Sequence, residues 1–419
     1  MPKGMGVQVP PRAPFVLQFV AQPESNQSEL SQNISGMRAS LKTKLLYPLI
    51  AMLIGVCAIE LISFIFFSVF RDRFGFRNVH AHTVARADIP KLKEQYNFSL
   101  GWKKRYPTPF GERPRSVEYG RPLLAAFGDS FTYCDQVGDA QTWEEQLAGT
   151  LAADIYNFGV DGYGTDQAYI RFEEDFQKVR APLVALGLIT ENINRIVNRY
   201  RPFYSEHTGH SLTKPRFILR GEVRELIQNP IRNADEIDKL LDPKFVESLG
   251  ENDWWFKRDN EPALGFPYTA ILFHKRFWLE IFHHRGGRHI DDLSPRPWAN
   301  LWTYPPARDL MFSIFDSFVN ESKAAGKAPF IILLPSHTEV LAEMQGRDPK
   351  KAAVVLSYCH ARGYACFNGV SALAKNARSE QDVNKFFDRH FTLLGNKVIA
   401  SELAAFLVER KLIEDRTKR

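Results

Sequence analysis

The sequence predicts an α/β protein: a three-layer α/β/α sandwich with a parallel sheet, preceded by one transmembrane helix. Two observations predict this class. From about residue 120 onward, short apolar runs alternate with segments of helical spacing, a pattern typical of parallel strands joined by right-handed helical crossovers. Before them lies one much longer apolar run, at residues 45–70.

The predicted strands and helices follow one another in order along the chain. The run "APLVALGLI" at 181–189 is almost wholly apolar, as a strand covered on both faces must be. By the same reasoning we expect strands at 122–127, 154–158, 181–189, 328–335 and 364–367. We expect helices at 142–152, 165–179, 310–323 and 349–361, and a closing helix with Val398, Leu403, Phe406 and Leu407 at helical spacing.

Residues 45–70 predict a membrane anchor. They carry a single charge, Glu60, and at about 1.5 Å per residue they are long enough to cross a bilayer core of about 30 Å. The apolar region of a signal peptide is shorter, about 7 to 15 residues, so a retained anchor is favoured over a removed signal. Glu60 is either a tolerated protonated side chain or paired with a partner helix. Basic residues on both sides of the run leave the topology open.

The rest of the chain divides around this anchor. We predict a disordered tail over 1–44, and a linker over 71–120 that wraps onto the domain. The α/β core would comprise 121–202 and 306–419. Between its two parts lies an insertion at 203–305, rich in tryptophan, which suggests either a carbohydrate platform or, more simply, packing of an added subdomain.

Composition excludes several classes of protein. The 54 basic and 48 acidic residues give a net charge of +6, without basic runs or basic-aromatic stripes, so nucleic acid is not expected as a partner. Four cysteines do not form a disulfide scaffold in a chain this long; Cys359 and Cys366 are either bridged or, more commonly, free. The spacing of His283, His284 and His289 matches no zinc template. We therefore expect no metal and no organic cofactor.

Small or polar residues follow each of the first three predicted strands. Gly128, Asp129 and Ser130 follow the first strand, Gly159 the second, and the segment 190–192 the third. Because the carboxyl ends of parallel strands share one edge of the sheet, these loops should meet at one crevice. A serine on a sharp turn at a strand exit, near a helix N-terminus, exposes its hydroxyl. The pattern therefore predicts Ser130 as a nucleophile.

A base for this serine is available near the C-terminus, in "FFDRHFTLLGN". His390 would accept the proton of Ser130, and Asp388 would hold the imidazole in the required tautomer. The N–H groups of Ser130 and Gly159, with the amide of Asn192, would hold an oxyanion. Simpler interpretations remain open: a capped turn at "GDS", a turn glycine at 159, a helix N-cap at 192, and a surface histidine at 390.

At these residues the sequence resembles the SGNH, or GDSL-type, hydrolase superfamily. "FGDSFTY", "NFGVDGYG", "GLITENINR" and "DRHFTLLG" are similar to its four blocks in order, with Ser130, Gly159, Asn192 and the pair Asp388 and His390. Two departures are visible: Glu191 precedes Asn192, and one residue separates Asp388 from His390 where many members have two.

The resemblance implies a flavodoxin-like SGNH fold and a serine ester hydrolase or O-acyltransferase. It also implies an acylated carbohydrate or envelope polysaccharide as substrate, a periplasmic or otherwise extracytoplasmic domain, and a polytopic membrane acyl-transfer protein as a partner of the transferase form. Asp129, Arg195 and His337 are weaker candidates for substrate contacts at the crevice. The alternative function is a non-catalytic polysaccharide-binding or assembly subunit that keeps the fold.

Overall fold

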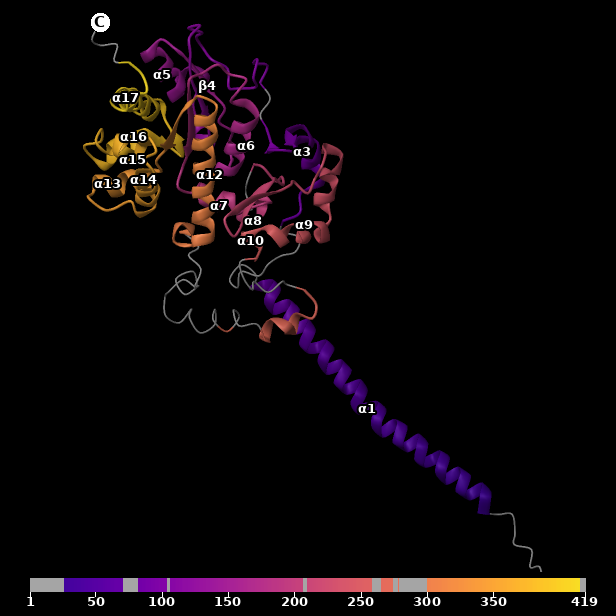
Figure 1. Cartoon of the computed structure of the whole chain (residues 1–419). Helices are drawn as coiled ribbons and strands as arrows, with labels where there is room; N and C mark the ends of the chain where they lie inside the picture. The colour runs from indigo at the N-terminus through magenta and orange to yellow at the C-terminus, as the bar shows by residue number, and fades with distance from the viewer. Residues whose placement is uncertain are drawn as a thin grey trace, which may run out of the picture. The chain divides into compact units, whose positions relative to one another are not determined.

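The structure is a computed structural model, and it describes residues 26–70, 82–103, 106–205, 209–257, 265–273, 278 and 300–414. The chain forms two compact units. One contains helix α1 (Asn26–Val69) and the short segment Phe266–Ala270. The other is the globular α/β unit that holds the rest of the described chain (Figure 1).

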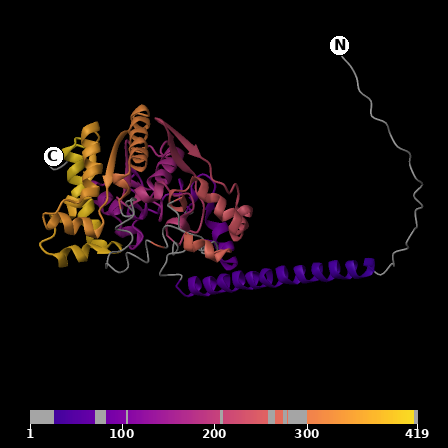
Figure 2. The same cartoon turned by 90° about the horizontal axis from the view of Figure 1, so that it is seen from below.

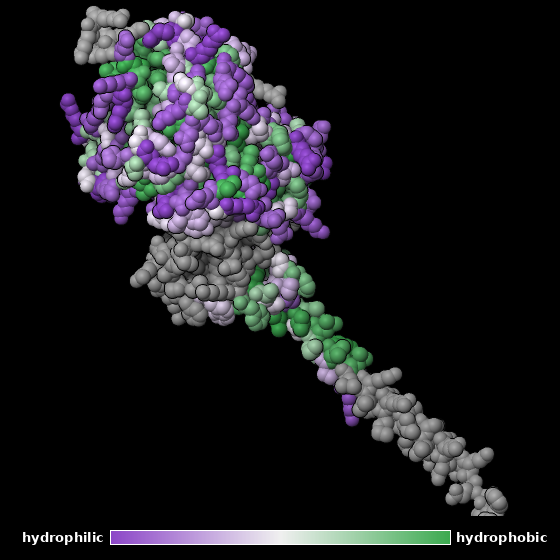
Figure 3. All heavy atoms as spheres, in the orientation of Figure 1, coloured by the Kyte–Doolittle hydropathy of each residue, from purple (hydrophilic) through white to green (hydrophobic). Residues whose placement is uncertain are grey.

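Helix α1 contains the predicted span. Among the described residues, it is the one helix long and apolar enough to cross a membrane, over Leu46–Val69, with a mean hydropathy of 2.6. The apolar side chains of this stretch are almost all exposed, and they appear as green spheres in Figure 3. The helix begins at Asn26, so it overlaps the tail that the sequence predicts as disordered over 1–44; residues 1–25 lie outside the described residues.

A five-stranded parallel sheet forms the centre of the globular unit, as predicted. The strand order is β4-β3-β5-β8-β9. The strands are β3 (Pro122–Phe127), β4 (Asp154–Asn157), β5 (Leu183–Leu188), β8 (Ala328–Leu333) and β9 (Cys366–Asn368). Each bound lies within a few residues of the prediction, and the carboxyl ends of β3, β4 and β5 lie at the same edge.

Helices cover both faces of this sheet. Alternate residues of β3 belong to different apolar clusters: Ala125 and Phe127 pack on one face, Leu124 and Ala126 on the other. The first face is covered by α6 (Thr165–Asp175), α12 (Pro305–Ala324) and α14 (Lys350–Arg362), the second by α5 (Trp143–Leu151), α15 (Gly369–Ala374) and α17 (Leu393–Glu409). Figure 2 shows the orange helix α12 and the yellow C-terminal helices packed around the central strands. The predicted three-layer sandwich is confirmed.

Shorter elements surround the core. They are η1 (Arg86–Asp88), α3 (Ile89–Gln95), β1 (Tyr96–Asn97), β2 (Gly101–Trp102), α4 (Ser130–Tyr133), η2 (Asp139–Gln141), α7 (Asn192–Ile196), α8 (Arg201–Tyr204), β6 (Arg216–Arg220), β7 (Val223–Ile227), η3 (Ala234–Leu241), α9 (Pro243–Leu249), η4 (Gly250–Asn252), α10 (Trp254–Lys257), η5 (Tyr268–Phe273), η8 (Leu301–Thr303), α13 (His337–Met344), α16 (Glu380–Phe386), β10 (Phe387–Asp388) and β11 (His390–Phe391). Trp255 and Trp302 are buried, which supports the packing interpretation of the insertion. His283, His284 and His289 lie outside the described residues.

All four cysteines are free. Cys359 on α14 is buried, and Cys366 on β9 is half-buried; no bridge joins them. The sequence leaves open a disulfide or two free thiols at Cys359 and Cys366, and the structure has the free thiols.

Candidate active site

Ser130 lies just beyond the carboxyl end of β3, as the first residue of the one-turn helix α4. The turn before it packs tightly: a Cβ on Gly128 would lie 2.9 Å from the carbonyl oxygen of Gly187, so only glycine fits there. The carboxylate of Asp129 accepts the N–H of Phe131 at 2.8 Å and caps the helix. Cys134, in the left-handed conformation with φ of 61°, ends it. The turn thus holds Ser130 against the sheet edge.

His390 lies beside Ser130. Its Nε2 lies 2.8 Å from the Oγ of Ser130, although 260 residues separate the two along the chain. The histidine sits in the hairpin β10–β11, which turns at Arg389 with φ of 60°. The backbone N–H of His390 donates to the Oε1 of Gln136 at 2.7 Å, and the imidazole packs beside the ring of Phe131, with centroids 4.7 Å apart. The fold therefore brings the predicted nucleophile and base into hydrogen-bond contact.

The surroundings favour the neutral form of this imidazole. Burial lowers the pKa of His390 below its ordinary value of 6.5, and the nearby carboxylates of Asp129, Asp135 and Asp161 only partly oppose this effect. Above its pKa the imidazole is uncharged, and Nε2 is able to accept the proton of the serine hydroxyl. The electrostatics of the site thus suit a general base at neutral pH.

Asp388 lies opposite His390 in the hairpin register, with an exposed side chain. Residues directly opposite one another on a hairpin point to the same face, with Cβ atoms about 4.5–5.5 Å apart. Within the described residues, however, no hydrogen bond joins the carboxylate of Asp388 to the imidazole. The orienting role of Asp388 stays a prediction that requires its side chain to rotate toward Nδ1.

The three predicted oxyanion donors differ in their availability. In the described part of the chain, no hydrogen bond uses the N–H of Ser130. The Nδ2 of Asn192 donates to the Oδ2 of Asp129 at 2.6 Å, which leaves one of its two amide hydrogens. The N–H of Gly159 already donates to the Oδ1 of Asn157 at 2.9 Å. The N–H of Ser130 is therefore the most available of the three donors. The side chain of Asn192 is 0% exposed, and its role at the oxyanion stays a prediction.

Gly159 has a clear packing role. A Cβ at this position would lie 2.3 Å from the backbone nitrogen of Tyr133, in helix α4. No side chain fits there, since real Cβ atoms do not come that close to backbone. The glycine lets the loop after β4 pass directly against the helix that carries Ser130.

The structure gives Asp129 a place different from the predicted substrate contact. The residue is 0% exposed, and its carboxylate accepts from the N–H of Phe131, the N–H of Ile189 and the amide of Asn192. Burial raises the pKa of Asp129, while the charge of Arg195 and these three donors favour its ionised form. A carboxylate enclosed in this way cannot touch a substrate, and instead ties the Ser130 turn to β5 and α7.

Arg195 and His337 also have partners within the protein. The Nη1 of Arg195 donates to the carbonyl oxygen of Tyr163 at 2.9 Å, and its Nη2 to Glu191 at 3.0 Å. Arg195 is only 6% exposed, so its guanidinium is mostly enclosed by the protein. Its positive charge favours the ionised form of Asp129. The Nε2 of His337 bonds to the Oδ1 of Asn384 at 2.6 Å. Substrate contacts by these two side chains stay predictions.

Two residues that the sequence analysis did not identify hold the loop after Ser130. Arg113 is 6% exposed, and its guanidinium donates to the carbonyl oxygens of Cys134 at 2.9 Å and Val137 at 2.6 Å, to that of Tyr133, and to the Asp139 carboxylate at 2.8 Å. Asn157 donates through its Nδ2 to the carbonyl oxygen of Thr132 at 2.7 Å. Arg113 falls in the predicted linker, where no sequence pattern indicates a role for it. For Asn157 the single signal in the sequence is its position at the end of a predicted strand.

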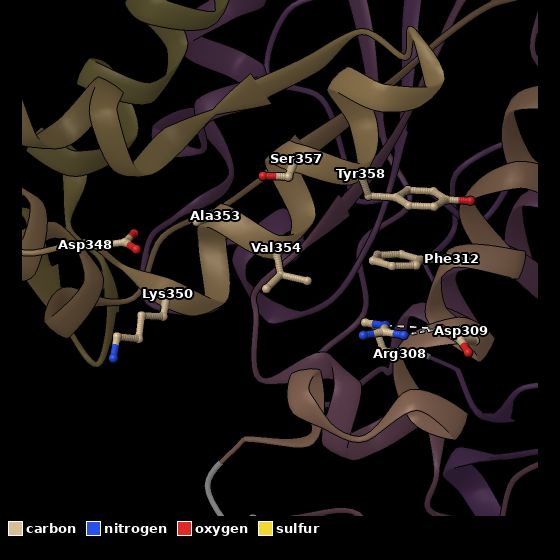
Figure 4. A pocket seen from close by; sticks show the side chains of 9 residues that line it. All are labelled: Arg308, Asp309, Phe312, Asp348, Lys350, Ala353, Val354, Ser357 and Tyr358. Atoms are coloured by element: carbon tan, nitrogen blue, oxygen red, sulfur yellow. Dashed lines mark hydrogen bonds and ion pairs between the residues drawn. The ribbon is translucent and has the colours of Figure 1, made fainter.

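A cavity of about 670 Å³ lies elsewhere, between α12 and α14 (Figure 4). Its wall includes the stacked rings of Phe312 and Tyr358, with centroids 3.7 Å apart, and none of the predicted site residues. Within the described ranges, no group of three or more His, Cys, Asp or Glu side chains could hold a metal ion.

The fold and the site define an α/β protein with a serine–histidine pair at the carboxyl edge of a parallel sheet. No family model and no curated protein matches this chain. Among solved structures, it is similar to one described as "a putative lipolytic protein of G-D-S-L family" from Desulfitobacterium hafniense, at 12% identity and a TM-score of 0.31, over 68% of this chain and 100% of that one. It is also similar to a member of the lipolytic protein G-D-S-L family from Veillonella parvula, at 12% identity and a TM-score of 0.31, over 68% of this chain and 96% of that one. Likenesses this remote carry no argument about activity.

Proposed function

We propose that this protein is a serine-dependent ester hydrolase or O-acyltransferase that works through an acyl-Ser130 intermediate. The observation that carries the proposal is the 2.8 Å contact between the Oγ of Ser130 and the Nε2 of His390. A hydroxyl at a helix start and a neutral imidazole within hydrogen-bond reach are the parts that nucleophilic acyl chemistry needs. The ordered SGNH-like blocks of the sequence support the same chemistry.

In the first half of the proposed reaction, the Oγ of Ser130 attacks the acyl carbonyl carbon while the Nε2 of His390 takes the hydroxyl proton. The oxyanion of the tetrahedral intermediate is held by the N–H of Ser130 and the remaining amide hydrogen of Asn192. His390 then gives its proton to the departing alkoxide. The alcohol leaves, and the acyl group stays on Ser130.

In the second half, the acceptor decides between the two activities. Water or a sugar hydroxyl gives its proton to His390 and attacks the acyl carbon, after which Ser130 leaves and recovers the proton. Water produces a free acid, and the sugar hydroxyl produces a new ester. Asp388 is proposed to support the imidazolium that forms in both halves, once its carboxylate turns to Nδ1.

We further propose that the protein is anchored in a membrane by residues 45–70 and acts on acylated carbohydrate or envelope polysaccharide outside the cytoplasm. The exposed apolar surface of Leu46–Val69 supports the anchor. The substrate class and the side of the membrane rest on the resemblance alone. A polytopic membrane acyl-transfer protein is the partner expected for the transferase form.

The test uses the full-length protein with a fluorophosphonate probe and an aryl acetate substrate. We expect covalent labelling on the peptide that contains Ser130, hydrolysis of the ester, and loss of both in Ser130→Ala. Ser357→Ala is the matched control, because Ser357 is an exposed serine in the wall of the cavity between α12 and α14, and this variant should behave as wild type. A folded wild-type protein that neither takes the label nor hydrolyses the ester would support the non-catalytic binding subunit instead.

A further inference from the structure

The single carboxyl group of the apolar part of α1 is hydrogen bonded to a distant segment of the chain. Glu60 accepts the backbone N–H of Tyr268 at 2.6 Å and that of Thr269 at 3.4 Å, and also the hydroxyl of Thr269. One turn further along α1, Phe64 packs against Tyr268, with ring centroids 4.9 Å apart. Residues Phe266–Ala270 belong to the same compact unit as α1. Of the two states that the sequence leaves open for Glu60, a lone protonated side chain or a pair with a partner helix, neither describes this contact with a short segment.

The position of Glu60 sets the depth of this contact. Along the helix axis Glu60 lies about 13 Å from Val69, the last residue of α1, at about 1.5 Å per residue. Leu46–Val69 is only slightly longer than a hydrocarbon core of about 30 Å. If these residues span a bilayer, the backbone of Tyr268 and Thr269 therefore lies inside the hydrocarbon region and not at its surface.

Glu60 and the docked segment satisfy one another's polar groups at that depth. The first N–H groups of the short helix η5 have no partners within that helix, and in lipid there is no water to bond them. Glu60 supplies acceptor oxygens to two of these groups, and they in turn supply donors to a carboxyl group that would be costly on its own. In water these N–H groups and this carboxyl group could bond to solvent instead. In lipid they have only one another as partners, so the contact is worth more there.

The docked segment presents exposed apolar side chains. Residues 266–270 read "FPYTA", without a charge. Phe266 is 79% exposed, and Pro267 and Ala270 are exposed as well. Over Leu46–Val69 of α1, the two buried side chains lie on the face of Glu60: Ser63 is 7% exposed and Phe67 0%, and both lie at helical spacing from Glu60. Large bare aromatic surface next to a membrane span is favourable in contact with acyl chains and unfavourable in water.

We propose that Phe266–Ala270 is a second membrane-inserted segment, which enters the bilayer beside α1 and is held there by Glu60. The inference rests on the membrane anchorage proposed above. The occupant of its exposed aromatic surface is the acyl-chain region of the bilayer, because the segment continues the apolar surface of the span itself. The chain thus contacts the membrane through two segments far apart in sequence.

The experiment measures depth in the full-length protein, reconstituted in phosphatidylcholine vesicles with nitroxide-labelled acyl chains. A fluorescent probe is attached to Phe266→Cys, in a Cys57→Ala, Cys366→Ala background. Two matched positions serve as references: Ile62→Cys on an exposed face of α1, 66% exposed, and Val223→Cys in the hairpin β6–β7, 68% exposed. We expect strong quenching at 266 and at 62, and little at 223.

Glu60→Ala then tests the role of the carboxyl group. We expect this variant to lose at least half of the quenching at 266 and to keep that at 62, with Glu60→Gln in between because one acceptor oxygen remains. Quenching at 62 without quenching at 266 overturns the insertion and leaves the anchor standing. Absence of quenching at both positions overturns the anchor, and the insertion with it. Unchanged quenching at 266 in a folded Glu60→Ala protein overturns the role of Glu60.

Discussion

The Ser130 loop, residues 128–139, and the His390 hairpin, Phe387–Phe391, meet at one hydrogen bond but are held in different ways. The Ser130 loop is fixed by buried polar side chains from other parts of the chain. Arg113 donates to the loop through all three of its guanidinium nitrogens, and Asn157 bonds to helix α4 inside it.

The hairpin depends on fewer contacts. Gln136 accepts the N–H of His390, and the ring of Phe131 packs against the imidazole and against Phe391. Asn396, in the first turn of α17, donates to the carbonyl oxygen of Phe391 at 3.3 Å. Two of these supports, Gln136 and Phe131, belong to the Ser130 loop itself. The Ser130 loop is thus held mainly by other parts of the fold, whereas the hairpin is held partly by the Ser130 loop.

The largest expected effect is the loss of the base. His390→Ala should lower kcat/KM for an aryl acetate by at least about 10⁴-fold, because among the described residues His390 is the imidazole bonded to Ser130. His337→Ala is the comparison variant. That histidine bonds to Asn384 and not to Ser130, so even the loss of a substrate contact should cost far less. Both variants are compared by steady-state kinetics.

Equal losses of kcat/KM in the two histidine variants would mean that catalysis needs both side chains. The site would then extend beyond the Ser130 loop and the His390 hairpin. A folded His390→Ala protein with near wild-type activity would end the general-base role. Near-ultraviolet circular dichroism serves as the check on folding.

The second prediction concerns stability, and it compares how strongly the Ser130 loop and the His390 hairpin are held. Arg113→Ala leaves loop carbonyl oxygens without donors and should lower the free energy of unfolding by about 2 to 4 kcal/mol. Gln136→Ala removes one acceptor from a half-buried site and should cost less than about 1 kcal/mol. Denaturant unfolding of the full chain in detergent, followed by the tryptophan signal, measures both.

A loss in Gln136→Ala as large as that in Arg113→Ala would overturn the view that the Ser130 loop is the more strongly held region. Arg113→Lys adds a second measure. A single ammonium cannot reach the several acceptors of a guanidinium, so this variant should recover only part of the loss.

Much of the fold could be predicted because β5 and β8 are apolar along nearly their whole length, a pattern that suits a sheet covered on both faces. The ends of elements were less predictable. The helix expected over 165–179 ends at Asp175, since apolar spacing continues past the point where helical bonding stops. The two-residue strands β1 and β2 had no periodicity to reveal them.

The meeting of Ser130 and His390 could be predicted because parallel strands end at one edge and because the motif order is specific. The supports of the site could not. Arg113 bonds to loop carbonyl oxygens only because the fold brings two distant segments together, and no local sequence motif marks such a contact. The same holds for Glu60, whose partners are backbone N–H groups of Tyr268 and Thr269 rather than side chains of another helix.

Asp388→Asn has a smaller expected effect than either loss above. If the carboxylate turns to Nδ1 when the imidazole becomes charged, its removal should lower kcat by about 10- to 100-fold, with little change in KM. Asp309→Asn, an exposed carboxylate in the wall of the cavity between α12 and α14, is the control. Unchanged kcat in Asp388→Asn would mean that the hairpin holds His390 without a carboxylate partner, and the site would then be a serine–histidine dyad.

The smallest expected effect is a shift in pH dependence, and it tests the electrostatic link between loop and hairpin. Burial lowers the pKa of His390, so the acid limb of kcat/KM should have its midpoint below 6.5, the ordinary value for histidine. Asp135, in the Ser130 loop, raises this pKa through its charge. Removing that charge in Asp135→Asn should therefore move the midpoint to lower pH, and less so at high salt. Activity is lost as pH falls through the midpoint, because the protonated imidazole no longer accepts the proton of Ser130. A midpoint above 6.5, or a shift to higher pH in Asp135→Asn, would contradict the assignment of the acid limb to a buried His390 that feels the charges of the loop.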